Sequence, residues 1–281
     1  MITGLDRTTL LVRDLETGVA AYRKILAREP VLLAADDGLE SAIFALDNMT
    51  LRLASPKGAG AQGEIARAHL DRTGEGLVEL AFRVDDIERC FRRLRRLSLA
   101  PEEISEAIEG DRSGGQPFDR KRTAISTRLA NGMDISFRNA DPQRRASPKH
   151  DASITGLDLI VLNTDNPERA MAFYGARLGL ALVYDQTNAK TGSRLMQFAC
   201  GDMVVEISHK PAEGESPRPD RLWGIGWSVA KAEDTRERLA RAGLNVSEVK
   251  DGAKRGTRVF TIRDGTCNVP TLVVQLLPDA D

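Results

Sequence analysis

The stretch ITGLD at residues 2–6 recurs unchanged at residues 154–158, and this repeat decides the fold of the 281-residue chain. The similarity continues beyond it. Residues 12–26 (VRDLETGVAAYRKIL) align with residues 164–178 (TDNPERAMAFYGARL), with glutamate, tyrosine and leucine at matching places. Internal repetition determines the architecture in which every other motif must be placed. The chain is therefore predicted to contain a duplicated unit.

Both halves show the same order of predicted elements, namely a strand, a helix and short strands, followed by a second strand, helix and strands. The first helix follows Asp14, a suitable N-cap, and carries apolar residues at helical spacing. Residues 42–54 and 194–208 each predict two strands around a tight turn. Residues 106–121 are expected to form a long loop. Each half is thus predicted to consist of two βαβββ modules.

The boundary between the halves is expected in a polar segment without apolar periodicity, NADPQRRASPKHDAS. We predict a first domain at residues 1–140, a linker at residues 141–153 and a second domain at residues 154–281. Whether the protein is a monomer or a homodimer is left open.

Composition narrows the classes of function. The formal net charge is −1, which favours neither nucleic acid nor a membrane as partner. The three cysteines show no CxxC spacing, and no apolar run approaches the roughly 20 residues of a membrane span. A cytoplasmic protein with a small-molecule ligand is expected.

The pattern resembles the vicinal oxygen chelate superfamily, which includes glyoxalase I, extradiol dioxygenases and bleomycin-resistance proteins. Its carriers are the two module openings, the second module starts LAFRVDDIERCFRRL and IGWSVAKAEDTRERL, and the strand GDMVVEI. The resemblance implies an α+β fold with two glyoxalase-like domains, each a half-barrel made from a pair of βαβββ modules. It does not imply one activity, because a shared fold hosts many chemistries.

The resemblance also implies metal ligands, typically a histidine on the first strand of a module and a glutamate on its last strand. The four first-strand positions instead hold Arg7, Glu79, Leu159 and Gly224. A last-strand carboxylate is supplied by Glu206, but the matching position of the first module holds Arg52. A divalent metal needs about three convergent protein ligands. We therefore predict no metal and no cofactor.

Only three histidines occur in the chain, and two of them, His69 and His150, are expected to be solvated. His209 follows the strand of Glu206. A weak metal site formed by Glu206 and His209 is one interpretation, and a strand-end histidine bonded to solvent or backbone is the preferred one.

In the first half, the former ligand positions predict a polar binding site made by Arg7, Arg52, Glu79 and Ser136. Two guanidinium groups beside one carboxylate would leave a positive charge for an anionic ligand. A structural ion pair between Arg7 and Glu79 is the alternative.

In the second half, Glu206 is the leading catalytic candidate, because a carboxylate in apolar surroundings is suited to act as a general base. The residues expected to contact a ligand around it are Tyr184, Met196, Phe198, His209 and Trp227. The alternative for the aromatic residues is a place in the core.

Two functions remain open from the sequence. The first is a metal-free protein that binds a small aromatic or hydrophobic molecule, which is possibly anionic. The second is an enzyme of the superfamily, either an isomerase or lyase that uses Glu206 as base, or a ring-cleaving dioxygenase with an atypical metal site.

Overall fold

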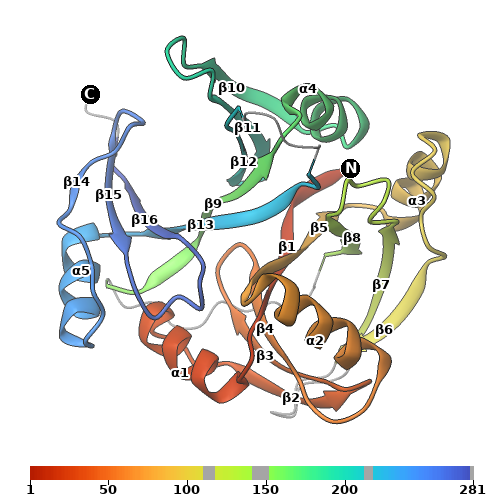
Figure 1. Ribbon diagram of the computed structural model, residues 1–281, viewed down its shortest axis with the longest axis horizontal. Coiled ribbons are helices and arrows are strands. Elements are labelled where there is room, and N and C mark those ends of the chain that lie inside the picture. The colour runs from red at the N-terminus through yellow and green to blue at the C-terminus, as the bar shows by residue number, and fades with distance from the viewer. Residues whose placement is uncertain (110–117, 141–151, 212–217, 279–281) are drawn as a thin grey trace. The chain divides into compact units, whose positions relative to one another are not determined.

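The computed structural model describes residues 1–109, 118–140, 152–211 and 218–278. Within these residues the strands form two sheets of eight strands each (Figure 1). The first sheet uses residues 2–139 and the second uses residues 154–276. Most of the expected linker falls outside the described residues.

The first sheet has the strand order β2-β3-β4-β1-β5-β8-β7-β6. Its strands are β1 (Ile2–Leu11), β2 (Val31–Asp36), β3 (Leu39–Ala45), β4 (Thr50–Pro56), β5 (Gly76–Val84), β6 (Ser105–Glu109), β7 (Phe118–Ile125) and β8 (Asp134–Asn139).

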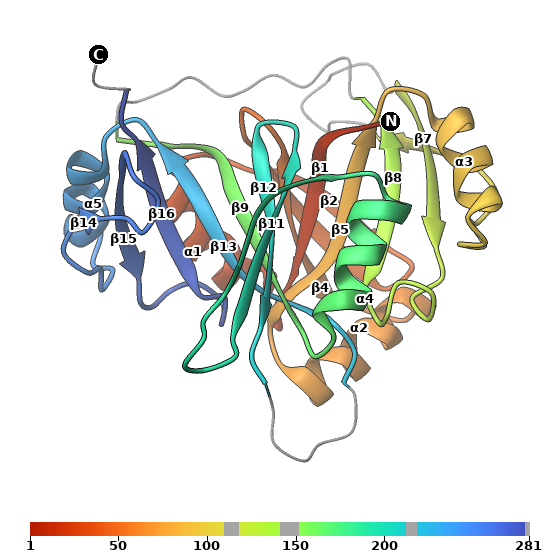
Figure 2. The ribbon, with the colours of Figure 1, turned by 90° about the horizontal axis from the view of Figure 1, so that it is seen from above.

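The second sheet repeats this topology as β10-β11-β12-β9-β13-β16-β15-β14. Its strands are β9 (Ile154–Thr164), β10 (Ala181–Thr187), β11 (Arg194–Cys200), β12 (Met203–His209), β13 (Arg221–Val229), β14 (Lys250–Asp251), β15 (Thr257–Ile262) and β16 (Thr271–Leu276). Figure 2 shows β11 and β12 side by side, as their antiparallel register requires.

The helices are α1 (Leu15–Leu26), α2 (Ala61–Thr73), α3 (Ile87–Arg96), α4 (Pro167–Ala170), the π-helical segment η1 (Met171–Arg177) and α5 (Ala232–Arg241). Helices α1 and α3 of the first half correspond to α4 with η1 and to α5 of the second half, whereas α2 has no counterpart among the described residues. The predicted α+β fold of tandem βαβββ modules is confirmed.

Local sequence explains where these helices begin. Asp14 accepts a hydrogen bond from the Thr17 amide at 2.7 Å, so it is the predicted N-cap of α1. Asn166 does the same for α4 through the Arg169 amide, at 2.9 Å. The two tight turns expected from the repeat are also present, because β3 pairs with β4 and β11 pairs with β12 in antiparallel register.

The prediction of a loop at residues 106–121 is wrong at both ends. Ser105 pairs with Arg122 and Glu109 pairs with Phe118, so β6 and β7 form an antiparallel pair on either side of residues 110–117. Charged residues dominate these strands, which hides the apolar alternation on which the prediction relied.

Packing groups the chain into two compact units that differ from the two sequence halves. Unit 1 contains residues 1–8, 78–143 and 159–223, and unit 2 contains residues 9–77, 144–158 and 224–281. Each unit therefore draws one module from each half. In the described part of the chain, no helix has the length and apolar character needed to span a membrane.

Each unit has an apolar core that includes aromatic rings. In unit 1, Phe82 and Phe137 stack at 5.9 Å between ring centres. In unit 2, Tyr22 of α1 is buried, and its hydroxyl donates to the carbonyl of Thr266 at 3.3 Å. Burial raises the pKa of Tyr22 well above its ordinary range.

Candidate functional site

Strand register in unit 1 assigns the side chains of β9, β10, β11 and β12 to two faces. Side chains alternate along a strand, and Cα partners on adjacent strands share a face. Phe198 is the Cα partner of Val205 and packs toward η1, with its ring centre 6.3 Å from that of Tyr174. Glu206 is the next residue on β12, so it lies on the opposite face. We call this face, turned away from η1, the open face.

A row of four side chains crosses the open face at Glu206. Gln197 is the Cα partner of Glu206, and its Nε2 donates to Oε2 of the carboxylate at 2.8 Å. Tyr184 is in turn the Cα partner of Gln197, and Val161 is the partner of Glu206 on β9. The row therefore runs Tyr184, Gln197, Glu206, Val161 across four adjacent strands.

Apolar side chains extend the open face next to this row. Leu159 and Val204 are Cα partners, and each lies two residues before a member of the row, so both share its face. Both are half-buried, as is Glu206. The carboxylate is thus oriented by the amide of Gln197 and bordered by the aliphatic side chains of Leu159 and Val204.

Tyr184 is accessible at the edge of this surface. It is 41% exposed on the outermost strand, and its hydroxyl donates to the side chain of Gln186. The structure therefore places Tyr184 on the same face as Glu206, at its rim.

Three other residues expected to contact a ligand lie in the core. Met196 and Phe198 are fully buried on the side facing η1, opposite to Glu206. Trp227 of unit 2 is fully buried, and its alternate neighbours Ile225 and Val229 are buried as well. Phe198 and Trp227 therefore lie in the core, which was the alternative given for the aromatic residues, and Met196 lies there as well.

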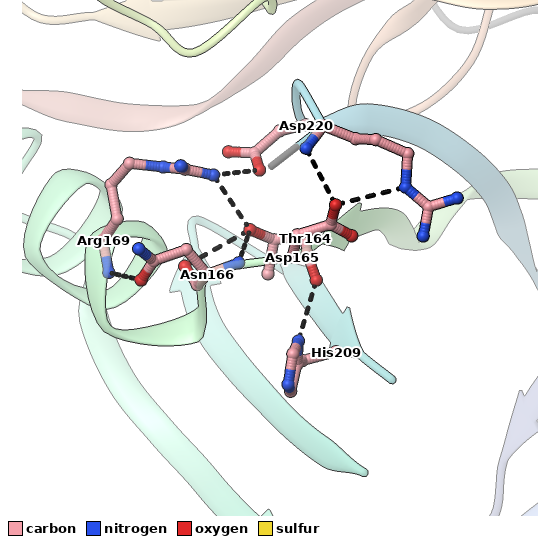
Figure 3. Close-up of polar contacts among 7 residues, drawn as sticks. Thr164, Asp165, Asn166, Arg169, His209 and Asp220 are labelled. Atoms are coloured by element: carbon pink, nitrogen blue, oxygen red, sulfur yellow. Dashed lines mark hydrogen bonds and ion pairs between the residues drawn. The ribbon is translucent and has the colours of Figure 1, made fainter. Parts of the chain in front are cut away.

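His209 does not converge with Glu206. The two residues are three apart on β12, so their side chains leave opposite faces of the strand. Nδ1 of His209 lies 3.0 Å from the carbonyl oxygen of Thr164 (Figure 3). A bond between His209 and a backbone carbonyl is one of the arrangements that the sequence analysis preferred for this histidine.

In the first half, Glu79 of β5 interacts with side chains of β8 in unit 1. Ser136 of β8 donates its hydroxyl to Oε1 of Glu79 at 3.0 Å, and Nη2 of Arg138 lies 3.7 Å from the same oxygen. All three side chains are buried. This face is therefore a charged network, in contrast to the face around Glu206.

Asp134 lies beside Glu79 as its Cα partner on β8. The residue is exposed to solvent, although its carboxyl group is partly desolvated by the protein around it. Desolvation, followed by repulsion from Glu79, raises the pKa of Asp134 to about 6. An accessible carboxyl with a perturbed pKa is typical of functional sites, though ion-pair networks produce it too.

The two arginines expected beside Glu79 occupy different units. Arg7 is buried in unit 1, whereas Arg52 belongs to unit 2 and donates from Nε to the hydroxyl of Ser41 at 2.9 Å. Arg138 also lies beside Glu79, and the sequence reasoning missed this residue.

The sequence reasoning also missed Gln197, although the register of the hairpin could have identified it. The two-residue turn at residues 201–202 makes Cys200 the partner of Met203, and counting back along both strands then pairs Gln197 with Glu206. No comparable signal identifies Tyr184, because a β-bulge between Leu182 and Tyr184 shifts the register.

The side chains do not match a divalent metal centre of the kind expected from the resemblance. Among the described residues, no group of three or more His, Cys, Asp or Glu side chains could hold a metal ion. The neighbours of Glu206 described above, Gln197, Leu159 and Val204, do not supply ligands for zinc or iron.

Comparison with known families identifies the second half. The family model described as the glyoxalase/bleomycin resistance protein/dioxygenase superfamily matches residues 156–267. The second half is therefore similar to the vicinal oxygen chelate superfamily. The resemblance expected from the sequence is thereby confirmed. No curated protein matches the chain.

Several solved structures match nearly the whole chain in fold. A mutant of 4-hydroxymandelate synthase from Streptomyces coelicolor gives a TM-score of 0.72 at 13% identity, covering 98% of this chain and 93% of its own. A Mn(II)-bound glyoxalase from Novosphingobium aromaticivorans gives 0.65 at 12% identity, covering 100% and 84%. A halotolerant catechol dioxygenase gives 0.65 at 12% identity, covering 98% and 87%. At these identities the similarity establishes the fold alone.

Proposed function

We propose that the protein binds a small hydrophobic or aromatic molecule on the open face of β9 to β12, without a metal centre. The row from Tyr184 to Val161 carries this proposal, since it combines an accessible aromatic ring, an oriented carboxylate and an aliphatic surface. Sites for small molecules usually join a mostly apolar surface with a few placed polar groups.

The chemistry of the row favours one kind of ligand. Strands lie ~4.8 Å apart, so Tyr184 and Glu206, which are two strands apart, are separated by about 10 Å, which spans a fused-ring aromatic molecule. The carboxylate of Glu206 accepts hydrogen bonds, so a ligand with an N–H or O–H group near one end fits best.

Probe binding tests this function directly. N-phenyl-1-naphthylamine is neutral and aromatic, carries one N–H group and fluoresces more strongly in apolar surroundings. We expect saturable binding to the wild-type protein, and an affinity about tenfold lower for Tyr184→Ala, equivalent to ~1.4 kcal/mol of lost aromatic contact.

Leu182→Ala is the matched control, because Leu182 lies on the same strand and is similarly exposed, at 43%. It is the Cα partner of Phe198, so its side chain is on the face turned toward η1. This variant should bind the probe like the wild type. Equal losses in both variants, or no saturable binding to the wild type, would refute the proposed surface.

A proton-transfer enzyme is the second candidate, favoured by the hydrogen bond that orients Glu206. In that case Glu206→Gln should abolish turnover of a substrate found by screening and should leave probe affinity within about twofold, since the amide keeps the shape of the acid. Turnover that persists in this variant would exclude Glu206 as the base.

A further inference from the structure

A buried polar cluster in unit 1 lies beneath helix α4 and segment η1, away from the open face. Its centre is Asp220, which is 7% exposed and accepts a hydrogen bond from Nη2 of Arg169 at 2.9 Å (Figure 3). The backbone N–H of Asp220 donates to the carbonyl of Asn131 at 2.9 Å. The cluster thereby joins the start of β13 to the loop before β8.

Tyr174 and Arg169, like the side-chain amide of Asn131, each carry a buried donor without a protein acceptor. The hydroxyl of Tyr174 is buried without a hydrogen-bond partner, on a residue that is 1% exposed. The Nε–H of Arg169 is likewise buried and without a partner. Buried donors without partners are rare in proteins, because each one costs the free energy of desolvation.

Both donors come from one helical stretch, because Arg169 lies in α4 and Tyr174 lies in the segment η1 that follows it directly. Burial raises the pKa of Tyr174 above its ordinary range, the charge of Asp220 raises it further, and the charge of Arg169 acts in the opposite direction.

The duplicated copy of this arrangement, in unit 2, has direct bonds instead. Tyr22 corresponds to Tyr174 in the repeat, and its hydroxyl donates to the carbonyl of Thr266. Glu75 precedes β5 as Asp220 precedes β13, and its carboxylate accepts from the backbone N–H of Arg13 at 2.8 Å. The missing acceptor is therefore specific to the second copy.

We propose that one internal water molecule occupies this site in unit 1, accepting hydrogen bonds from Tyr174 and Arg169 and donating to Asp220. A water molecule can accept two hydrogen bonds and donate two, which matches two donors beside a carboxylate. A small anion would also accept from both donors, but it would face the negative charge of Asp220. A metal cation would face two N–H or O–H donors.

A crystal structure of the full-length protein at about 1.2 Å resolution tests this proposal. We expect a single water peak within about 2.6–3.2 Å of Tyr174 Oη, Arg169 Nε and a carboxylate oxygen of Asp220. No peak there, or a direct hydrogen bond from Tyr174 to a protein acceptor, would overturn the proposal. A bromide soak that gives an anomalous peak at the site would show an anion site and would overturn it as well.

Two variants extend the test. In Tyr174→Phe the water should be lost or should move away from the ring, because one of its two donors is gone. Tyr22→Phe is the matched control in the other copy and should leave the water near Tyr174 in place. A water that keeps its position and occupancy in Tyr174→Phe would contradict the assigned hydrogen bond, and the wild-type structure decides the question if either variant fails to fold.

Discussion

At the scale of single residues, the two copies use their central strands differently. The face around Glu79 in the first copy holds buried charges bonded to one another, such as Glu79 with Ser136 and Arg138. The face around Glu206 in the second copy is mainly aliphatic. Burying a charge is costly unless it is paired. The paired charges around Glu79 are therefore consistent with a structural role, and the aliphatic face around Glu206 is consistent with ligand binding.

Asp134 gives a prediction about pH. Its folded pKa, about 6, is above the ordinary value of 3.8, so the folded state binds this proton more tightly than the unfolded state. The contribution of Asp134 to stability is full below pH 4 and is lost as the pH rises through 6. Asp134→Asn should remove this dependence and raise the free energy of unfolding at pH 7 by less than ~1 kcal/mol, after allowance for solvent screening.

Urea unfolding of wild type and variant at pH 4, 5, 6 and 7 measures this difference. The two stability curves should diverge between pH 4 and 6, in favour of the variant at the upper end. Parallel curves would show that Asp134 has an ordinary pKa. An NMR titration of the Asp134 carboxyl should find the midpoint near pH 6.

The residues of the candidate site were partly predictable from the sequence. Glu206 follows from the repeat and the resemblance, and Gln197 follows from the hairpin register. The faces of Met196, Phe198 and Trp227 were not predictable, because a shift of one residue in register moves a side chain to the other face.

At the scale of elements, a buried ion pair joins β1 to β7. Nη2 of Arg120 lies 2.5 Å from Oδ1 of Asp6, and both side chains are 2% exposed. The same nitrogen of Arg120 donates to the carbonyl of Asn139. Removing one partner of such a pair leaves a buried charge without compensation.

Asp6→Ala should therefore lower the free energy of unfolding by about 3 kcal/mol. The double variant Asp6→Ala, Arg120→Met removes both charges and should recover most of that loss. Chemical denaturation of the three proteins checks this expectation. A double variant no more stable than Asp6→Ala would mean that the loss comes from packing and not from the unpaired charge.

Helix starts were predictable at this scale, but helix type was not. Asp14 and Asn166 are N-caps as their side chains suggest. The aligned stretches 12–26 and 164–178 have equal length, yet one forms the α-helix α1 and the other changes to π geometry in η1. The π geometry is rare, and the aligned sequences alone do not indicate which copy adopts it.

At the scale of the whole molecule, duplication determines the topology of both sheets. The strand orders of the two sheets are the same, element for element. The repeat does not determine which modules pack together, since each compact unit combines a module from each half. Packing between modules depends on complementary surfaces, which one sequence without its structure does not reveal.

The most direct measurement for the proposed function is a crystal structure of the full chain with N-phenyl-1-naphthylamine. We predict that its rings lie on Leu159 and Val204 beside Tyr184, that its N–H group donates to Glu206, and that no metal ion is bound to that carboxylate. A probe bound away from β9 to β12, or a metal ion held at Glu206 by protein ligands, would contradict the account.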